Sequence, residues 1–381
     1  MSAPTVRILP RIAGVPASQW DALFDPGYPF TTHAFLDALE RSGSVAPAKG
    51  WEPRHLLLER DGVPVAAMPC YAKAHSWGEF VFDFAWADAA GRLGLRYYPK
   101  LLCAAPFTPA TGPRLGARSA GDRDALLAAA QREAEGFSSM HLLFLEPAEA
   151  QTCASAGLLA RHDVQFHWHR GAESDFAGFA ARLTHDKRKK IVRERRRVAE
   201  AGLRFETLPG DALDEAQWHA VYRLYASTYD ERGQAPYLTP EFFLDYGRRA
   251  GTPIRLILAR DGGALVAVAI TFVGGDTLYG RHWGCAERHH SLHFETCYYQ
   301  GIELCLREGL RRFDAGAQGA HKLARGFDPV LTRSAHAIAD PRLRSAVAAF
   351  LARERRWIER QQRALDEHRP YRRMEHAGPP A

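Results

Sequence analysis

The sequence of 381 residues contains few cysteines, and none of them stand in a CxxC pair. This scattered spacing excludes a zinc ribbon and a small disulfide scaffold. We therefore expect free thiols in a reducing compartment, which indicates a cytoplasmic protein. The six cysteines are Cys70, Cys103, Cys153, Cys285, Cys297 and Cys305.

Long apolar stretches are also missing. Residues 1–20 lack the apolar core of a signal peptide. No apolar run approaches the roughly 18 residues that a membrane-spanning helix needs. We expect a protein without a signal peptide or a transmembrane segment.

The composition shows no global bias. Apolar residues make up 46% and charged residues 25%, which excludes wholesale disorder. The net charge is +6, yet Lys187–Arg197 (KRKKIVRERRR) alone carries +7, so the rest of the chain sums to −1. The basic character is local and is weak evidence for nucleic-acid binding by the whole surface. The length predicts about two domains.

The chain repeats itself over 200 positions. His55–Gly62 (HLLLERDG) matches Arg255–Gly262 (RLILARDG), and a second apolar run follows each segment. Each pair predicts two strands joined by a turn at Asp-Gly. Upstream, Ala17–Phe24 (ASQWDALF) parallels Glu215–Tyr222 (EAQWHAVY). An ordered series of matches at this period indicates duplicated domains.

A second pair of short helices and a later helix–strand pair extend the repeat. Thr32–Leu39 parallels Thr239–Tyr246, and predicted helices at residues 122–136 and 294–309 each precede a strand. This order matches the GNAT acyltransferase topology, so we predict an α/β fold with tandem GNAT-like domains, each a mixed central sheet flanked by helices. The predicted parts are residues 1–165, residues 166–340, and a C-terminal helix and tail at 341–381.

Five long strings then carry a family resemblance. They are Leu278–Cys285 (LYGRHWGC), Leu292–Glu303 (LHFETCYYQGIE), Gly316–Phe327 (GAQGAHKLARGF), Tyr97–Leu101 (YYPKL) and Pro106–Leu115 (PFTPATGPRL). Together they resemble the FemAB-like family of bacterial N-acyltransferases, which is linked to peptidoglycan biosynthesis or recognition. The resemblance covers essentially the whole chain.

The resemblance implies acyl or aminoacyl transfer to an amine acceptor, from acyl-CoA, an acyl-carrier protein or aminoacyl-tRNA. The alternative is a non-catalytic module that recognises a peptide, a cell-wall precursor or tRNA. One departure stands out, because the family pattern has Glu where this chain has Ala320. If that Glu were the general base, this chain would lack it.

The segment Gly316–Phe327 is rich in glycine and has no strand periodicity, so we expect a loop. His321, Lys322 and Arg325 would supply cationic donors there. Gln318 would add a neutral amide. Such a loop suits a carboxylate, a phosphate or a developing oxyanion. A tight turn with solvated charges is an equally good interpretation.

The strand expected at Tyr279–Cys285 places Arg281 and Trp283 on one face. His282 and the two neighbouring glycines would lie on the other face, where a histidine can approach a substrate and act as a base near neutral pH. A core histidine bonded to the backbone is the alternative.

The start of the next helix offers three hypotheses. Glu295 is a candidate general base or ligand of the acceptor amine, and Cys297 a candidate nucleophile at a helix N-terminus. His289 and His293 have i,i+4 spacing but no obvious third ligand, so we expect no metal. The predicted catalytic residues are Arg281, His282, Glu295, His321 and Lys322; Tyr279, Trp283, His293, Gln318 and Arg325 are predicted to bind substrate.

In the first half, Lys100, Thr108 and Arg114 belong to a Pro/Gly-rich region and are further candidate substrate ligands. Asp83 lies in an aromatic segment that predicts a strand, as a substrate ligand or a buried structural carboxylate. Arg118 and Gly121 partly match the acetyltransferase loop that cradles the coenzyme A pyrophosphate at a helix N-terminus. They make acyl-CoA a possible cofactor.

The basic segment Lys187–Arg197 is predicted to be helical, with Asp175 as the N-cap of a helix that ends at Gly202. An apolar stripe would pack and the other faces would be cationic. Such a helix can bind an anionic partner: a tRNA acceptor arm, an anionic lipid or an acyl-carrier protein. A solvated face is the plainer interpretation.

Overall fold

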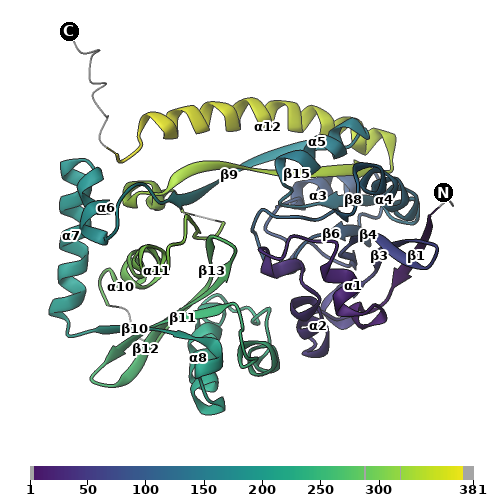
Figure 1. Cartoon of the computed structure of the whole chain (residues 1–381). Coiled ribbons are helices and arrows are strands. Elements are labelled where there is room, and N and C mark those ends of the chain that lie inside the picture. Colours follow the sequence, from purple (N-terminus) through teal and green to yellow (C-terminus); the bar gives the residue numbers. More distant parts are fainter. Residues whose placement is uncertain (1–3, 287–288, 318, 372–381) are drawn as a thin grey trace, which may run out of the picture.

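The computed structural model describes residues 4–286, 289–317 and 319–371. Within these residues, one sheet of eleven strands passes through both halves of the chain, and a second sheet of four strands belongs to the first half. Helices cover both sheets (Figure 1). The predicted α/β fold with mixed sheets is confirmed.

The eleven-stranded sheet begins in the second half of the chain and ends in the first. In spatial order its strands are β10 (Arg204–Pro209), β11 (Ile254–Asp261), β12 (Ala264–Gly274), β13 (Thr277–Cys285), β14 (Arg312–Asp314), β9 (Leu159–His169), β15 (Asp328–Ile338), β8 (Ser139–Leu142), β6 (Lys100–Cys103), β5 (Cys70–Lys73) and β2 (Trp51–Pro53). The four-stranded sheet has the order β1 (Thr5–Leu9), β3 (His55–Arg60), β4 (Val63–Met68) and β7 (Gly116–Ala117).

The helices are divided between the two halves of the chain. In the first half they are α1 (Ala17–Asp21), α2 (His33–Arg41), α3 (Phe84–Arg92), α4 (Ala120–Glu133) and α5 (Pro147–Ser155). In the second half they are α6 (Phe176–Arg182), α7 (His185–Glu200), α8 (Glu215–Asp230), α9 (Pro240–Phe242), α10 (Leu292–Phe294), a π-helical turn η7 (Glu295–Tyr299), α11 (Gln300–Glu308), a 3₁₀ turn η8 (Ala320–Arg325) and α12 (Pro341–Glu367).

Both predicted hairpins form. Asp61 and Gly62 adopt positive φ in the turn between β3 and β4, and Gly262 and Gly263 do so between β11 and β12. The second turn lies one position later than the predicted Asp-Gly. Each hairpin also carries an irregularity at the same distance from its turn, after Leu58 in the first and after Ala259 in the second. The shared turn and the shared irregularity support the duplication read from the sequence.

Each half contains a parallel strand pair, β6 with β8 and β13 with β14. The two pairs are joined through β9 and β15, which run antiparallel beside each other in the middle of the sheet. Figure 1 shows α12 lying along the top of the molecule above these two strands. The boundary predicted between residues 165 and 166 falls inside β9.

The predicted basic helix differs from the structure, which has two helices there. Asp175 accepts a hydrogen bond from Gly178 N and caps the short α6, while the basic residues lie on α7. Leu183 is extended, because it bridges to Tyr371 and its neighbour Thr184 donates from N to Pro370 O at 2.8 Å. Pairing with the C-terminal segment thus replaces a helical turn.

The strand predicted around Asp83 is also wrong, since Asp83 precedes the first turn of α3. None of the helices formed by the described residues combines the length and the apolar character that crossing a bilayer requires.

Candidate active site

A cavity opens where β13 and β14 diverge. The two strands pair only from Thr277 opposite Arg312 to Tyr279 opposite Asp314. Beyond this point lies a cavity of about 220 Å³, which we call the splay cavity. The predicted residues that line it are Arg281, His282, Trp283, His293 and Lys322, together with Gly280, Cys297, Tyr298 and Ala315–Ala317.

Arg281 occupies a β-bulge in β13. The register changes from Ile270 opposite His282 to Thr271 opposite Gly280, so Arg281 is the extra residue. Its side chain is 2% exposed, and Nη2 donates to Asp314 Oδ1 at 3.1 Å. Bulges near active sites re-aim side chains in this way. The bulge also places Gly280, which faces Phe313 and Ala315, on a different side from His282, contrary to strict alternation.

Two donor groups of Arg281 stay open. Its Nε and Nη1 are buried and meet no hydrogen-bond acceptor among the residues that the structure describes. Burial opposes ionisation of Asp314, yet the neighbouring guanidinium holds the pKa of that carboxyl below its usual range. A buried arginine that lines a cavity with two free donors is suited to bind a carbonyl oxygen or an anion.

Lys322 reaches the same cavity from η8. It is 2% exposed, and its Nζ donates to Ala315 O at 2.8 Å and Gly316 O at 2.7 Å. Burial lowers the pKa of Lys322 to about 8, while Asp314 opposes and Arg281 adds to this shift. A neutral lysine keeps two N–H groups for the two carbonyls and has one lone pair left. The geometry therefore suits a general base near neutral pH.

The three histidines are weaker bases. Burial lowers the pKa of His282 to about 3 and that of His293 to about 4. Burial also lowers the pKa of His321, whose Nε2 lies 2.9 Å from Tyr298 Oη. Neutral histidines of this kind can donate or accept one hydrogen bond, but they hold a proton poorly at pH 7.

Glu295 has a different place from the one predicted. Its carboxylate is buried and bound by Arg195, with Nη2 at 2.9 Å from Oε1, and by Gln300 Nε2 at 2.8 Å. It does not line the splay cavity. Arg195 belongs to α7, so this pair ties the basic helix to the π-turn η7.

The surroundings of Cys297 do not favour a reactive thiolate. Cys297 lines the splay cavity, but burial raises the pKa of its thiol. The apolar surroundings outweigh any effect of the helix start, because desolvation disfavours the charged form.

Three other predicted residues of the second half pack around the site or line its edge. Arg325 is buried and donates from Nη2 to Glu194 Oε1 at 2.8 Å. Tyr279 packs with Tyr28 and Phe30, at ring distances of 6.0 and 5.1 Å. Trp283 lines the cavity edge-on to His293, at 5.2 Å. Gln318 lies outside the described residues.

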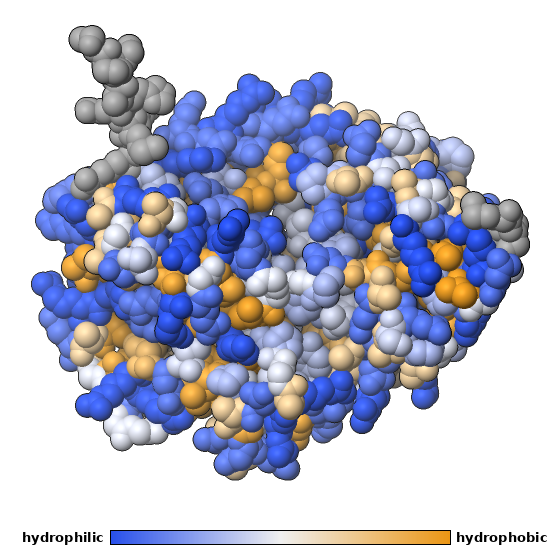
Figure 2. Space-filling model, viewed as in Figure 1, coloured by the Kyte–Doolittle hydropathy of each residue, from blue (hydrophilic) through white to orange (hydrophobic). Residues whose placement is uncertain are grey.

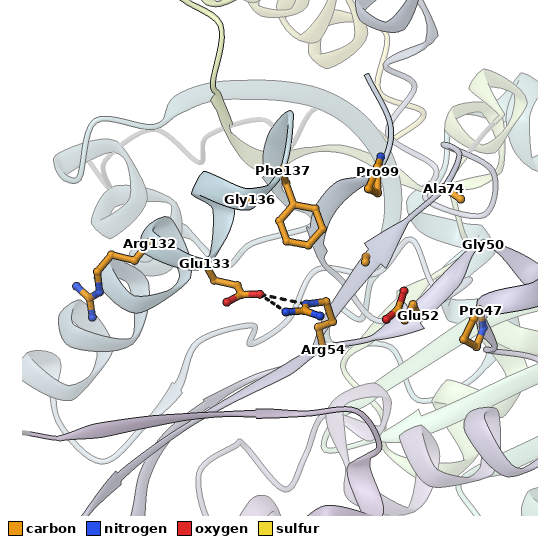
Figure 3. Close-up of a pocket in the computed structure, with 11 residues that line it drawn as sticks. Pro47, Gly50, Glu52, Arg54, Ala74, Pro99, Arg132, Glu133, Gly136 and Phe137 are labelled. Atoms are coloured by element: carbon orange, nitrogen blue, oxygen red, sulfur yellow. Dashed lines mark hydrogen bonds and ion pairs between the residues drawn. The ribbon is translucent and has the colours of Figure 1, made fainter. Parts of the chain in front are cut away.

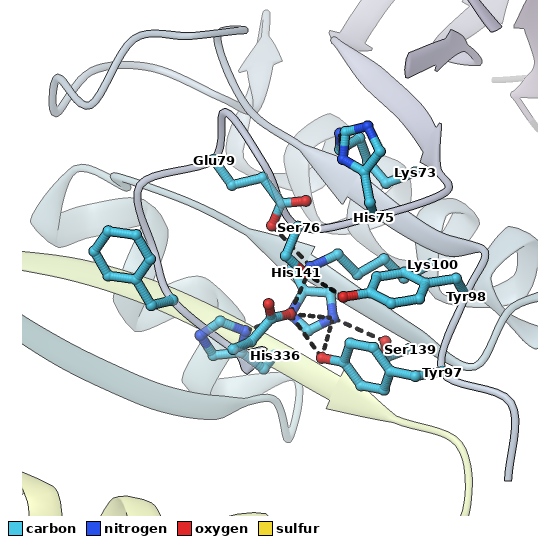
Figure 4. A network of polar contacts seen from close by, with 12 residues as sticks. Lys73, His75, Ser76, Glu79, Tyr97, Tyr98, Lys100, Ser139, His141 and His336 are labelled. Atoms are coloured by element: carbon cyan, nitrogen blue, oxygen red, sulfur yellow. Dashed lines mark hydrogen bonds and ion pairs between the residues drawn. The ribbon is translucent and has the colours of Figure 1, made fainter. Parts of the chain in front are cut away.

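In the first half, Lys100 belongs to a buried polar network (Figure 4), and Asp83 is one of its partners. Lys100 Nζ donates to Asp83 Oδ2 at 2.5 Å, to Glu79 Oε2 at 2.8 Å and to Ser76 Oγ at 2.8 Å. Burial raises the pKa of Glu79 to about 7, and Tyr97 Oη donates to Asp83 at 2.7 Å. Asp83 is thus the buried structural carboxylate that the sequence analysis gave as one alternative.

Arg114 and Thr108 lie where the parallel strands of the first half diverge. Arg114 is fully buried, and Nε, Nη1 and Nη2 donate to the carbonyl oxygens of Leu143, Pro113 and Ala110 at 2.8–3.1 Å. Thr108 Oγ1 donates to Pro106 O at 3.0 Å. These side chains hold the loop together.

The predicted pyrophosphate loop fits an anion poorly. Arg118 and Gly121 are exposed beside the start of α4, where Ser119 Oγ accepts from Asp122 N at 3.1 Å. The Asp122 carboxylate stands at this helix N-terminus and pairs with Arg60 at 2.6 Å. A fixed negative charge already occupies the position that would attract a phosphate.

Other cavities lie beside the site and in the first half. One of about 300 Å³, the α12 cavity, lies between α12, β9, β15 and Phe80–Phe82, and shares Ala317 with the splay cavity. Another of about 380 Å³ shares Trp283 and His293 with it. A cavity of about 620 Å³ lies in the first half, where Arg54 donates hydrogen bonds to the Glu133 carboxylate (Figure 3). It contains none of the predicted residues.

The sequence analysis missed Asp314, His167 and Tyr298. Asp314 ends a parallel strand, and polar residues at the carboxyl ends of such strands commonly mark sites, so this signal was available. His167 Nε2 lies 3.8 Å from Asp314 Oδ2 through the strand pairing of β9, which the sequence does not reveal. Within the described residues, no group of three His, Cys, Asp or Glu side chains is placed to hold a metal ion.

Two divergent parallel strand pairs in one continuous sheet define a tandem GNAT fold, and comparison with solved structures agrees. FemX matches with a TM-score of 0.53 at 11% identity, over 88% of this chain and 98% of FemX. The C-terminal domain of a putative lysylphosphatidylglycerol synthetase from Agrobacterium fabrum matches with 0.52 at 11% identity, over 88% and 95%. These identities show the fold alone.

The chain belongs to the FemAB-like family, described as peptidoglycan biosynthesis/recognition, which matches residues 11–373. No curated protein matches the sequence.

Proposed function

We propose that this protein transfers an acyl or aminoacyl group to an amine acceptor in the splay cavity. Its family and fold support a transferase of this kind. The observation that carries the proposal is the pairing of Arg281, with two buried open donors, and Lys322, with a pKa of about 8, at one cavity. Acyl transfer to an amine needs both an oxyanion donor and a base.

The reaction divides between these two side chains. The acceptor reacts as its neutral amine, whose lone pair attacks the carbonyl carbon of the donor, and neutral Lys322 takes the proton that the nitrogen loses as the amide forms. The negative charge that develops on the carbonyl oxygen meets Nε and Nη1 of Arg281. The amide C–N bond forms, the ester or thioester bond breaks, and Lys322 returns its proton to the departing carrier. Alignment within the cavity supplies the remaining rate acceleration.

We propose that the donor carrier docks on α7. Lys189, Arg193, Arg196 and Arg197 are exposed on this helix. Lys190 contributes to the lowered pKa of His321, which agrees with α7 running beside η8 at the site. Coenzyme A, an acyl-carrier protein and the acceptor arm of tRNA are all anionic and complement such a surface. All six cysteines are free, which agrees with the cytoplasmic location we propose.

The test is a single-turnover assay with labelled donors. Purified protein would be mixed with acyl-CoAs, an acylated carrier protein or aminoacyl-tRNA, each with a panel of primary amines, and the product analysed for a new amide by mass spectrometry. Transfer from one donor class supports the proposal and names the donor. Tight donor binding, seen as thermal stabilisation, without any amide from any donor would replace it with the non-catalytic module.

A further inference from the structure

Three exposed aromatic side chains gather beside α12. Trp77, Phe82 and Trp357 are 52%, 53% and 53% exposed. The ring of Phe84 lies 5.2 Å from that of Trp77 and 6.3 Å from that of Phe82, and Phe82 and Trp357 line the same α12 cavity. They form one patch, which we call the aromatic rim. Patches of this kind mark interaction surfaces more often than scattered apolar residues do.

A row of arginines adjoins the aromatic rim. Arg353, Arg356, Arg360 and Arg363 follow one another at intervals of three, four and three, so they share one face of α12. Trp357 stands within one turn of the first three. All four are exposed, and none has an ion pair with any residue in the described part of the chain. Figure 2 shows the corresponding upper edge of the molecule as mainly hydrophilic.

Hydrogen bonds and ion pairs anchor the segments that carry the aromatic rim. Arg161 binds Glu354 of α12 through two hydrogen bonds of 2.9 and 2.8 Å and also donates to Phe82 O at 2.8 Å. On either side of Phe82, Glu79 and Asp83 are fixed by Lys100 (Figure 4). These contacts anchor the backbone that carries Phe82 and tie it to α12. Leaving large rings in water costs free energy that a partner can recover.

We propose that the aromatic rim and the arginine row dock this protein on the surface of an anionic bilayer. Aromatic rings favour the headgroup region, and arginines beside them meet anionic lipids. A nucleic acid is favoured less here, because the denser positive charge lies on α7, which lacks such a cluster of exposed rings. If the proposed function holds, the acceptor amine is carried by a membrane-borne molecule that enters the α12 cavity and reaches the splay cavity past Ala317.

The experiment measures vesicle binding and needs no transfer activity. The full chain would be sedimented with vesicles of phosphatidylcholine alone and with one third phosphatidylglycerol. We expect binding only to the anionic vesicles, weakened by salt. Brominated lipids should quench tryptophan fluorescence on binding, because Trp77 and Trp357 would enter the headgroup region. Trp357→Ala should reduce that quenching.

Matched charge variants locate the surface. Arg353→Gln with Arg360→Gln should weaken binding at least tenfold, since each arginine near an anionic surface contributes about fivefold, or about 1 kcal/mol. The double variant Lys189→Gln, Arg193→Gln removes two exposed charges from α7 instead. Its affinity for anionic vesicles should change less than threefold. No binding to anionic vesicles, a loss only with the α7 variant, or displacement by tRNA acting at the arginine row would each overturn the proposal.

Discussion

The two parallel strand pairs end in opposite ways. After Cys103 and Leu142 the first pair diverges around Arg114, whose guanidinium is bound by three backbone carbonyls. After Tyr279 and Asp314 the second pair diverges around a cavity, and Arg281 keeps two buried donors open. The same duplicated framework therefore carries a closed end in one half and an open end in the other.

The two buried arginines differ in how many of their donor groups have partners. Arg114 gains its stabilisation from the fold itself, since each nitrogen meets an oxygen. Burying the Arg281 guanidinium costs the free energy of its hydration. Among the described residues, Asp314 is the one side chain that offsets this cost with a hydrogen bond. Buried polar groups left without partners in a cavity wall are expected to find them in a ligand. From this comparison we expect a structural role for Arg114 and a chemical role for Arg281.

The largest effect is expected at Lys322. Lys322→Met should lower kcat by about 10²–10⁴, the usual contribution of a general base. Wild-type activity should rise with pH through about 8, because Lys322 must lose its proton to act, and this rise should vanish in the variant. Stopped-assay rates from pH 6 to 9 check it, with Lys49→Met, at an exposed position of the first half, as the control. A variant that keeps the rise would assign the base elsewhere.

Arg281→Gln should lower kcat by about 10²–10³, or about 3–4 kcal/mol, by removing the oxyanion donors. The buried Asp314 loses its partner in this variant, so the free energy of unfolding in urea should fall as well, and kcat is expressed per folded protein. A rate loss matched by an equal loss of folded protein would place Arg281 with the structural residues.

Arg114→Met should lower the free energy of unfolding by about 2–4 kcal/mol, because three carbonyl groups lose their donors inside the core. The specific activity of the remaining folded protein should not change. Arg118→Met, at an exposed position four residues later, is the control and should stay within about 0.5 kcal/mol. Equal effects of the two variants would contradict the closed-end interpretation.

The variant Glu295→Gln distinguishes a general base from a structural carboxylate. The carboxylate binds Arg195 and lies outside the cavity, so kcat should change less than about threefold while unfolding becomes easier by about 1 kcal/mol. Denaturation curves and initial rates on the same preparation check both. A rate loss of about a hundredfold or more would restore Glu295 as the general base.

The sequence predicted the duplicated framework well because its hairpins are local. The turns at Asp61–Gly62 and Gly262–Gly263 are formed by the glycine-containing dipeptides that themselves predict a hairpin turn. Arg281 and Lys322 were found through the glycines around them, which a close approach requires. Their distinction from Arg114 was not predictable, since it depends on which carbonyls a long side chain reaches across the fold.

The network around Lys100 shows the same limit. Glu79, Asp83 and Lys100 are spread over 22 positions, and no periodicity brings them together. The strand predicted at Asp83 failed because aromatic residues suit strands, whereas here they surround the start of α3 and cover α12. Likewise the break between α6 and α7 depends on a contact with Tyr371, nearly 190 residues away.

The smallest effect concerns Ala320, where the resemblance given in the sequence analysis implies Glu in relatives. Ala320 lines the α12 cavity two positions before Lys322. In Ala320→Glu the new carboxylate would favour the charged form of the nearby lysine, so the pH at which activity rises should move upward by less than about one unit. The rate at pH 7 should then fall a few-fold. If the Glu of the family pattern were itself the base, the variant would instead gain activity and its rise would move toward acid. The direction of that shift decides whether this chain has replaced a carboxylate base by Lys322 or has lost one.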